Sequence, residues 1–230
     1  MNILTGAKEY IDKKTAEQIA KLINKYSEKQ SFVTLALPGG RSVSGIFSNL
    51  LEQTISWNKV HIFLIDERLV TLNSEESNFK LIKESLLNSL VTSGKLPPEN
   101  IHPFKYDKNS LDSGISFYEQ ELLEISNYFD IILVSSGEDG HIAGLFPNHE
   151  TILNTSQFFM KTSTSPKLPE KRMSASKNLI ERSKSAVILF IGEEKRQALS
   201  NFDNPALTIE QCPAKLIKNI HDNYIITDLI

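Results

Sequence analysis

The sequence lacks the features that mark secreted or membrane proteins. Cys212 is the only cysteine in 230 residues, so an intrachain disulfide is excluded and a reducing compartment is expected. No apolar run approaches the roughly 18 residues of a membrane span. The first 14 residues carry acids and lysines and no apolar signal segment. We therefore expect a cytoplasmic protein that has no membrane contact.

An excess of positive charge and metal-ligand spacings are also missing. The 25 basic and 28 acidic side chains give a net charge of −3, whereas nucleic-acid-binding surfaces are usually basic. The five histidines, at positions 61, 102, 141, 149 and 221, show no paired ligand spacing. No Gly-x-x-x-x-Gly-Lys-Ser/Thr loop is present for nucleotide triphosphates. We expect no nucleic-acid partner, no metal and no cofactor.

What the sequence does contain is an alternation of strand and helix patterns. Compact apolar runs predict strands at 32–37, 60–65, 129–134 and 186–191. Helical periodicity predicts helices at 7–29, 42–53, 78–90, 115–125 and 193–200. We also expect an edge strand at 224–227 and a mobile polar loop at 162–171. This order predicts one domain over 1–230, a three-layer α/β/α Rossmann-like fold with a mainly parallel sheet and helices on both faces.

Two of the strand ends combine turn residues with functional groups. The most informative is the loop 135–147, where Asp139, Gly140 and His141 follow a buried strand. A strand end can hold an imidazole where substrate reaches it, although a lone histidine is more often a surface or core residue. The other is Pro38-Gly39-Gly40-Arg41-Ser42, whose glycines and helix start would suit an anion. The same turn is also common as an ordinary strand-to-helix connection.

Charged groups mark the remaining strand ends. Asp66-Glu67-Arg68 follows the second strand, either as a solvated ion pair or as groups aimed into a crevice. Lys195 lies in the first turn of a helix, where the helix dipole disfavours a cation unless an anion is near. Arg172 is a second candidate phosphate ligand, and for both residues a surface position is the alternative. Because ligands bind outside the carboxyl ends of parallel strands, we expect these loops to meet.

Together these segments resemble a known enzyme family, 6-phosphogluconolactonase. The similarity rests on blocks that occur in order from Leu37 to Lys195: Leu37-Pro38-Gly39-Gly40-Arg41-Ser42, Ile65-Asp66-Glu67-Arg68-Leu69-Val70, Glu76-Ser77-Asn78, the loop 137–147, Pro169-Glu170-Lys171-Arg172-Met173-Ser174 and Ile191-Gly192-Glu193-Glu194-Lys195. The Gly-x-Asp-Gly-His block followed by Leu-Phe-Pro is specific, and the Gly-Gly turn is not.

The related glucosamine-6-phosphate isomerase/deaminase is the nearest alternative. That enzyme typically continues after the histidine loop with Phe-Asn-Glu-Pro, whereas this chain has Gly144-Leu145-Phe146-Pro147 and no carboxylate. The chain also departs from the lactonase pattern at Arg41, Thr71 and Ile142. A non-catalytic sugar-phosphate sensor on the same fold is a further alternative, but residues 1–30 show no helix-turn-helix that would serve as an output module.

The resemblance implies hydrolysis of a phosphosugar lactone, 6-phospho-D-glucono-1,5-lactone, in the oxidative pentose phosphate pathway. His141 would then activate water, Asp139 would orient His141, and Arg68 would stabilise the developing oxyanion. Asp66 would contact sugar hydroxyls or organise Arg68. The 6-phosphate would be held by Gly39, Gly40, Arg41, Ser42, Arg172 and Lys195. Whether the chain acts as a monomer or a homodimer stays open.

Overall fold

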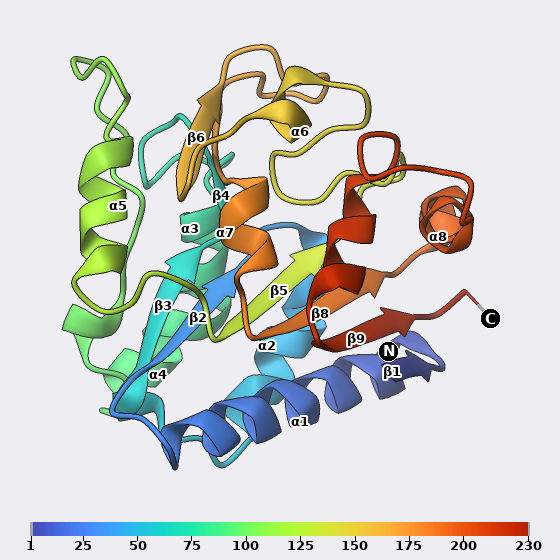
Figure 1. Cartoon of the computed structure of the whole chain (residues 1–230). Coiled ribbons are helices and arrows are strands. Elements are labelled where there is room, and N and C mark those ends of the chain that lie inside the picture. The colour runs from blue at the N-terminus through green and yellow to red at the C-terminus, as the bar shows by residue number, and fades with distance from the viewer. Residues whose placement is uncertain (1, 230) are drawn as a thin grey trace.

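The computed structural model describes residues 2–229, apart from the side chain of Arg41. Its centre is a six-stranded parallel sheet in the order β1-β9-β8-β5-β2-β3 (Figure 1). The bounds of these strands are β1 Asn2–Thr5, β2 Val33–Leu37, β3 Val60–Leu64, β5 Ile131–Ser135, β8 Ser185–Phe190 and β9 Asp222–Thr227. The prediction of a mainly parallel sheet is therefore confirmed.

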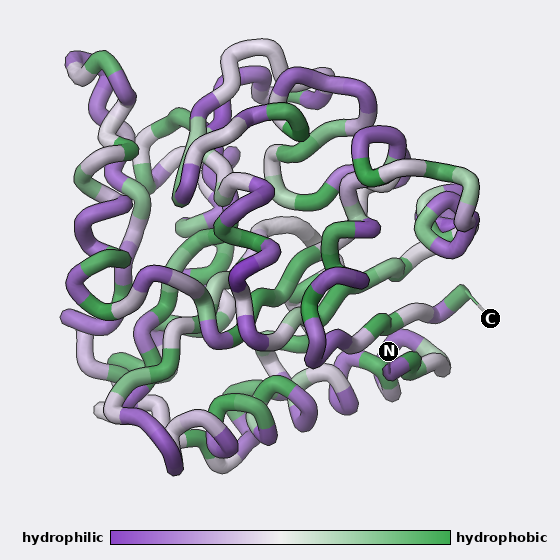
Figure 2. Tube along the Cα trace, in the orientation of Figure 1, coloured by the Kyte–Doolittle hydropathy of each residue, from purple (hydrophilic) through white to green (hydrophobic). Residues whose placement is uncertain are grey.

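Helices cover both faces of this sheet, as the sequence predicted. In Figure 1, α1 (Lys8–Ser27) and α2 (Ser44–Leu51) lie below it, while α7 (Lys177–Glu181) lies above it. Buried residues recur on one side of α1, from Ile11 to Ile19 and Ile23, so a single stripe meets the sheet. The strands β2, β3 and β8 are buried at every position and mostly apolar, and Figure 2 shows a hydrophobic centre there.

The remaining helices connect or flank the strands. The predicted helix at 78–90 is one helical stretch, in which a π-helical segment (Lys83–Leu87) joins α3 (Asn78–Ile82) to α4 (Asn88–Thr92). The other α-helices are α5 (Ile115–Leu123), α6 (Glu150–Leu153) and α8 (Arg196–Asp203). Short 3₁₀ turns are η1 (Arg41–Val43), η2 (Trp57–Lys59), η4 (Pro98–Asn100), η5 (Glu193–Lys195) and η6 (Pro213–Asn219).

A second, antiparallel sheet was not predicted. It has three strands in the order β4-β7-β6, namely β4 (Asp66–Arg68), β7 (Arg172–Ala175) and β6 (Phe159–Thr162). The charged triplet Asp66-Glu67-Arg68, which follows β3 in the sequence, is therefore itself a strand, and Asp66 pairs with Ser174. Three charged residues carry no apolar alternation, so only pairing with β7 reveals this strand.

The expectation of an edge strand at 224–227 is wrong in one respect. The strand exists as β9, but it lies inside the sheet, between β8 and β1. The edge is β1, whose four residues were not predicted because their side chains are largely exposed and form no apolar pattern. The predicted loop at 162–171 begins one residue later, since Thr162 still pairs with Arg172.

Candidate active site

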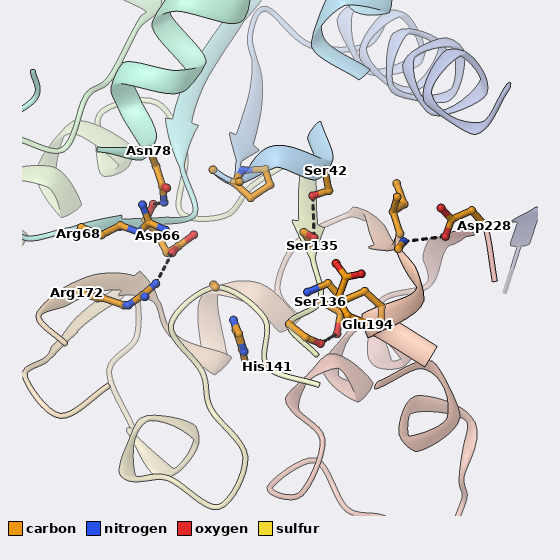
Figure 3. A pocket seen from close by; sticks show the side chains of 18 of the residues that line it. Ser42, Asp66, Arg68, Asn78, Ser135, Ser136, His141, Arg172, Glu194 and Asp228 are labelled. Atoms are coloured by element: carbon orange, nitrogen blue, oxygen red, sulfur yellow. Dashed lines mark hydrogen bonds and ion pairs between the residues drawn. The ribbon is translucent and has the colours of Figure 1, made fainter. Parts of the chain in front are cut away.

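The loops that follow the strands border one cavity of about 480 Å³ (Figure 3). The cavity lies where the carboxyl ends of β2, β5 and β8 meet the small antiparallel sheet. The predicted site residues that line it are Gly39, Gly40, Ser42, Asp66, Arg68, His141, Arg172 and Lys195. Asp139 lies behind His141 and does not line the cavity. The side chain of Arg41 falls outside the described part of the chain.

His141 is held by the carboxylate that the sequence placed two residues before it. Its Nδ1 lies 2.5 Å from Asp139 Oδ1, and its backbone N–H donates to the same oxygen at 3.1 Å. Burial disfavours a charged Asp139, but the hydrogen bond and charge of His141 outweigh it and lower the pKa of Asp139 to about 2. An ionised Asp139 accepts a hydrogen bond from Nδ1–H, so Nε2 keeps its lone pair for a ligand.

The glycines of this loop make room for the imidazole. A Cβ on Gly137 would lie 2.0 Å from both Cε1 and Nδ1 of His141, so only glycine fits beneath the ring. Gly140 has φ of +88° and packs on Cys212, whose Sγ would lie 2.9 Å from an added Cβ. Gly137 is thus required by the imidazole above it, and Gly140 by its backbone conformation and its contact with Cys212.

The glycine turn after β2 forms another part of the wall. Gly40 has φ of +98° and leads into η1, and the hydroxyl of Ser42 donates to Ser135 Oγ at 3.1 Å. Gly39 lies directly against Asn78, whose Oδ1 would be 1.9 Å from an added Cβ. Asn78 also lines the cavity and donates from Nδ2 to the Asp66 carbonyl at 2.9 Å.

Asp66, Arg68 and Arg172 lie together on another side of the cavity, away from Ser42 (Figure 3). Asp66 faces Arg172, with 3.9 Å between Oδ2 and NH1. The Arg172 side chain is buried and donates to the carbonyls of Pro169, Lys167 and Leu168. Burial lowers the pKa of Arg172 and Asp66 opposes that effect. Arg172 therefore anchors the preceding loop through Nε and NH2, while its NH1 faces Asp66 at the cavity.

Arg68 has a different set of contacts. Its NH1 donates to the Glu76 carbonyl at 2.5 Å, and its Nε is buried with no hydrogen-bond partner among the described residues. Among the described residues, Arg172 rather than Arg68 forms the ion pair with Asp66. Arg68 thus reaches the cavity with part of its hydrogen-bonding capacity free.

Lys195 lies in η5 and also lines the cavity. Gly192 begins this turn with φ of +97°, and its N–H donates to Asp228 Oδ1 at 2.9 Å. The half-buried Lys195 lies close enough to the histidine loop to affect Glu138. The hydrogen bond from Lys167 lowers the pKa of Glu138 most, and the charge of Lys195 adds to that shift.

The sequence reasoning missed several residues of the cavity wall. These are Lys8 at the start of α1, Asn78, Ser135 and Ser136, and the carboxylates of Glu194 and Asp228. Lys8 and Asp228 lie outside the segments that the sequence singled out, and the others lie inside those segments but were given no role. Among the lining residues, Lys8, Arg68, Arg172 and Lys195 outnumber Asp66, Glu194 and Asp228 by one positive charge, although the whole chain is net negative. This local balance favours an anionic ligand.

Other ligand classes find less support in the described residues. Within residues 2–229, no group of three or more His, Cys, Asp and Glu side chains is arranged to hold a metal ion. None of the described helices has the length and apolar character that a membrane span needs. The chemistry of the cavity is that of an imidazole beside several cations.

Known proteins resemble this chain over most of its length. The family described as glucosamine-6-phosphate isomerases/6-phosphogluconolactonase matches residues 7–226. The chain belongs to this family. It is 36% identical over 199 residues to a 6-phosphogluconolactonase of Borreliella burgdorferi, covering 86% of this chain and 84% of that protein. It is 31% identical over 186 residues to the one of Thermotoga maritima, with 80% of each chain covered.

Solved structures of the family share the whole fold. The crystal structure of 6-phosphogluconolactonase from Thermotoga maritima has a TM-score of 0.83 and 27% identity, covering 100% of this chain and 99% of that chain. A monomeric glucosamine-6-phosphate deaminase reaches the same TM-score of 0.83 at 17% identity, covering 99% and 97%. Since both kinds of enzyme have this fold, the choice between the two reactions depends on the residues of the site.

Proposed function

We propose that this protein hydrolyses 6-phospho-D-glucono-1,5-lactone to 6-phosphogluconate, the lactonase step of the oxidative pentose phosphate pathway. The observation that carries the proposal is the His141–Asp139 pair, 2.5 Å apart, at a cavity with an excess of cationic side chains. A lactone carbonyl is already electrophilic. Its hydrolysis therefore needs an activated water and stabilisation of negative charge, which these groups provide.

His141 acts first as a general base. Asp139 accepts a hydrogen bond from Nδ1–H, so Nε2 takes a proton from water while the water oxygen attacks C1 of the lactone. A bond forms between C1 and that oxygen, and the carbonyl oxygen becomes an oxyanion. Arg68 stabilises this charge with the part of its guanidinium that faces the cavity. The C1–O5 bond then breaks, and the protonated His141 returns the proton to O5.

The phosphate is held by groups that suit its charge and its oxygens. The backbone of Gly39 and Gly40, the Ser42 hydroxyl and the Lys195 ammonium form one part of this set. Arg172 contributes through NH1, and Arg41 belongs to the same proposal through its place in the turn. Asp66 holds Arg172 and accepts hydrogen bonds from sugar hydroxyls.

The deaminase alternative lacks a residue that it would need. Leu145 and Phe146 occupy the positions after the histidine loop and are fully buried. Neither side chain can act as an acid or base, so ring opening assisted by a carboxylate there has no donor. This difference favours the lactonase.

The test is an assay of the purified protein on freshly generated 6-phosphogluconolactone, with proton release measured above the spontaneous rate. A second reaction contains glucosamine 6-phosphate and measures ammonia. Lactone hydrolysis without ammonia is expected. Ammonia release without lactone hydrolysis would replace the proposal with the deaminase, and stabilisation by phosphosugar without either reaction would indicate a sensor.

The phosphate site is tested with Lys195→Ala. Loss of one charge-assisted contact is expected to raise KM about 10-fold and leave kcat nearly unchanged, as for uniform binding. Lys108→Ala, at an exposed lysine away from the cavity, serves as the control. A loss confined to kcat would contradict the anchoring role of Lys195.

A further inference from the structure

Glu67 is a buried carboxylate that the proposed reaction does not use. Glu67 lies in β4 between Asp66 and Arg68, and its side chain is turned away from the cavity that these two neighbours line. Glu67 is only 1% exposed. Burial raises the pKa of Glu67, and hydrogen bonds from its neighbours oppose that effect. Such a group is costly unless its oxygens are fully paired, so its contacts show what it does.

Each oxygen of Glu67 accepts two hydrogen bonds. Oε1 accepts from the backbone N–H groups of Arg68 and Asn78, both at 2.8 Å. Oε2 accepts from the Phe79 N–H at 2.8 Å and from the Ser77 hydroxyl at 2.9 Å. All four partners are donors in this arrangement, so the site fits a group that only accepts. A glutamine of the same shape would turn an NH₂ group toward two of these donors.

The contacts of Glu67 lead directly to the cavity wall. They hold the first residues of α3 and thereby fix the backbone of Asn78, which is 2% exposed. The side chain of Asn78 lies over Gly39 and is oriented by its bond to the Asp66 carbonyl. The amide of Asn78 therefore borders the cavity in one orientation, next to Arg68 (Figure 3). The proposed mechanism gives Asn78 no role.

We propose that Asn78 binds the sugar part of the lactone and that Glu67 is its positioning residue. This inference rests on the proposed function. The free hydrogen-bonding positions of the Asn78 amide would meet a ring hydroxyl, while Glu67 keeps that amide in register with Arg68. Glu67 acts through Asn78 and does not touch the substrate.

A double-mutant cycle tests this relation. Glu67→Gln, Asn78→Ala and the double variant are compared with the original protein in kcat and KM for the lactone. Kd for 6-phosphogluconate is measured by calorimetry in the same set. Each single variant is expected to lower kcat/KM about 10-fold, mostly by raising KM, and to raise Kd about 10-fold. Because Glu67 acts through Asn78, the double variant is expected to lose no more kcat/KM and affinity than the more impaired of the two single variants.

Controls separate positioning from a general effect on folding. Glu75→Gln changes an exposed carboxylate near the same segment, paired with Lys80, and is expected to leave KM unchanged. A merely structural role of Glu67 would reduce the active fraction, so kcat per total protein would fall at constant KM. If Glu67→Gln does not fold, Ser77→Ala takes its place in the cycle, since it removes one donor to Oε2.

The outcomes are distinct. The inference is supported if Glu67→Gln raises KM and Kd in the original protein but not in the Asn78→Ala background. If the effects of the two substitutions multiply, to roughly 100-fold together, the inference is overturned. It is also overturned if the KM of Glu67→Gln equals that of Glu75→Gln. Absence of lactone turnover in the original protein would overturn the proposed function alone, because the cycle in Kd still decides whether Glu67 positions Asn78.

Discussion

The histidines of this protein occupy two contrasting environments. His141 lies at the carboxyl end of the sheet, with a carboxylate on Nδ1 and an open cavity beside it. His61 and His102 lie near the opposite end of β3 and bind each other, with 3.0 Å between Nδ1 of His61 and Nε2 of His102. His102 also stacks on Phe63, with ring centroids 4.2 Å apart.

The difference shows how the environment decides the use of an imidazole. Burial lowers the pKa of His102 to about 4, with smaller contributions from the nearby charges of His61 and Lys105. A ring of that kind stays neutral at pH 7 and serves packing. His141 instead combines access to solvent with an ionised partner, which is the arrangement that general base catalysis requires.

The largest effect is expected for removal of the cavity imidazole. His141→Ala should lower kcat for lactone hydrolysis by about 10²–10⁴-fold, since that is the usual contribution of a general base. The circular dichroism spectrum and melting temperature should stay unchanged. His221→Ala, at an exposed histidine, is the control. Turnover of His141→Ala equal to this control would remove His141 from the mechanism.

Displacing the same ring without removing it should have the next largest effect. A methyl group on Gly137 would lie 2.0 Å from His141, so Gly137→Ala must move the imidazole. We expect a loss of about 10²-fold in kcat, which is typical of a misplaced catalytic group. Gly94→Ala has a strained φ but open space and lies outside the cavity, so it should affect stability only. Normal kcat in Gly137→Ala would mean that the ring position is not critical.

A smaller loss is expected when His141 keeps its place but loses its charged partner. Asp139→Asn retains the shape but replaces the charged acceptor of the Nδ1–H hydrogen bond with a neutral amide. The expected decrease in kcat is at least about 10-fold and below that of His141→Ala, because the ring still reaches the cavity. KM for the lactone should change little. A kcat within twofold of the original would show that Asp139 has no catalytic effect.

At the other histidine site the expected effect is on stability. In the folded protein His102 takes up a proton only near pH 4, whereas in the unfolded chain it does so near 6.5. Its contribution to stability is therefore complete above pH 6.5, declines as the pH falls toward 4 and is absent below. Between pH 7 and 5 this amounts to about 2 kcal/mol.

Urea unfolding at pH 7 and pH 5 measures this effect. His102→Gln stays neutral and can still pair with His61, so its free energy of unfolding should decrease less on acidification than that of the original protein. Glu121 lies 3.8 Å from His102, and its pKa is raised by burial, which acts in the opposite direction in both proteins. Equal decreases in the two proteins would contradict the assignment to His102.

Much of the main sheet could be predicted from the sequence. The strands β2, β3, β5 and β8 are short apolar runs because both of their faces are buried, and each begins and ends within two residues of its predicted bounds. By contrast, β1 and β4 carry no such pattern. Their side chains are exposed or charged, and only hydrogen bonding to β9 and β7 holds them in place.

The candidate site divides in the same way. The loop that holds His141 was predicted because its glycines and Asp139 act on a residue at most four positions away. Lys8 and Asp228 were missed because no local pattern links positions so far apart, and Asn78 lay in a matched block but was given no role. The loop contacts of Arg172 were also missed, since a sequence does not show which carbonyls a guanidinium will meet.

By itself, then, the amino-acid sequence determined the parallel sheet, the family and the pairing of His141 with Asp139, because burial patterns and short-range motifs involve neighbouring residues. The tertiary structure alone decided that β9 lies inside the sheet, that Asp66 faces Arg172 and that Glu67 holds Asn78 beside the cavity. These features depend on which distant segments pair, and that is settled by the packing of the whole chain.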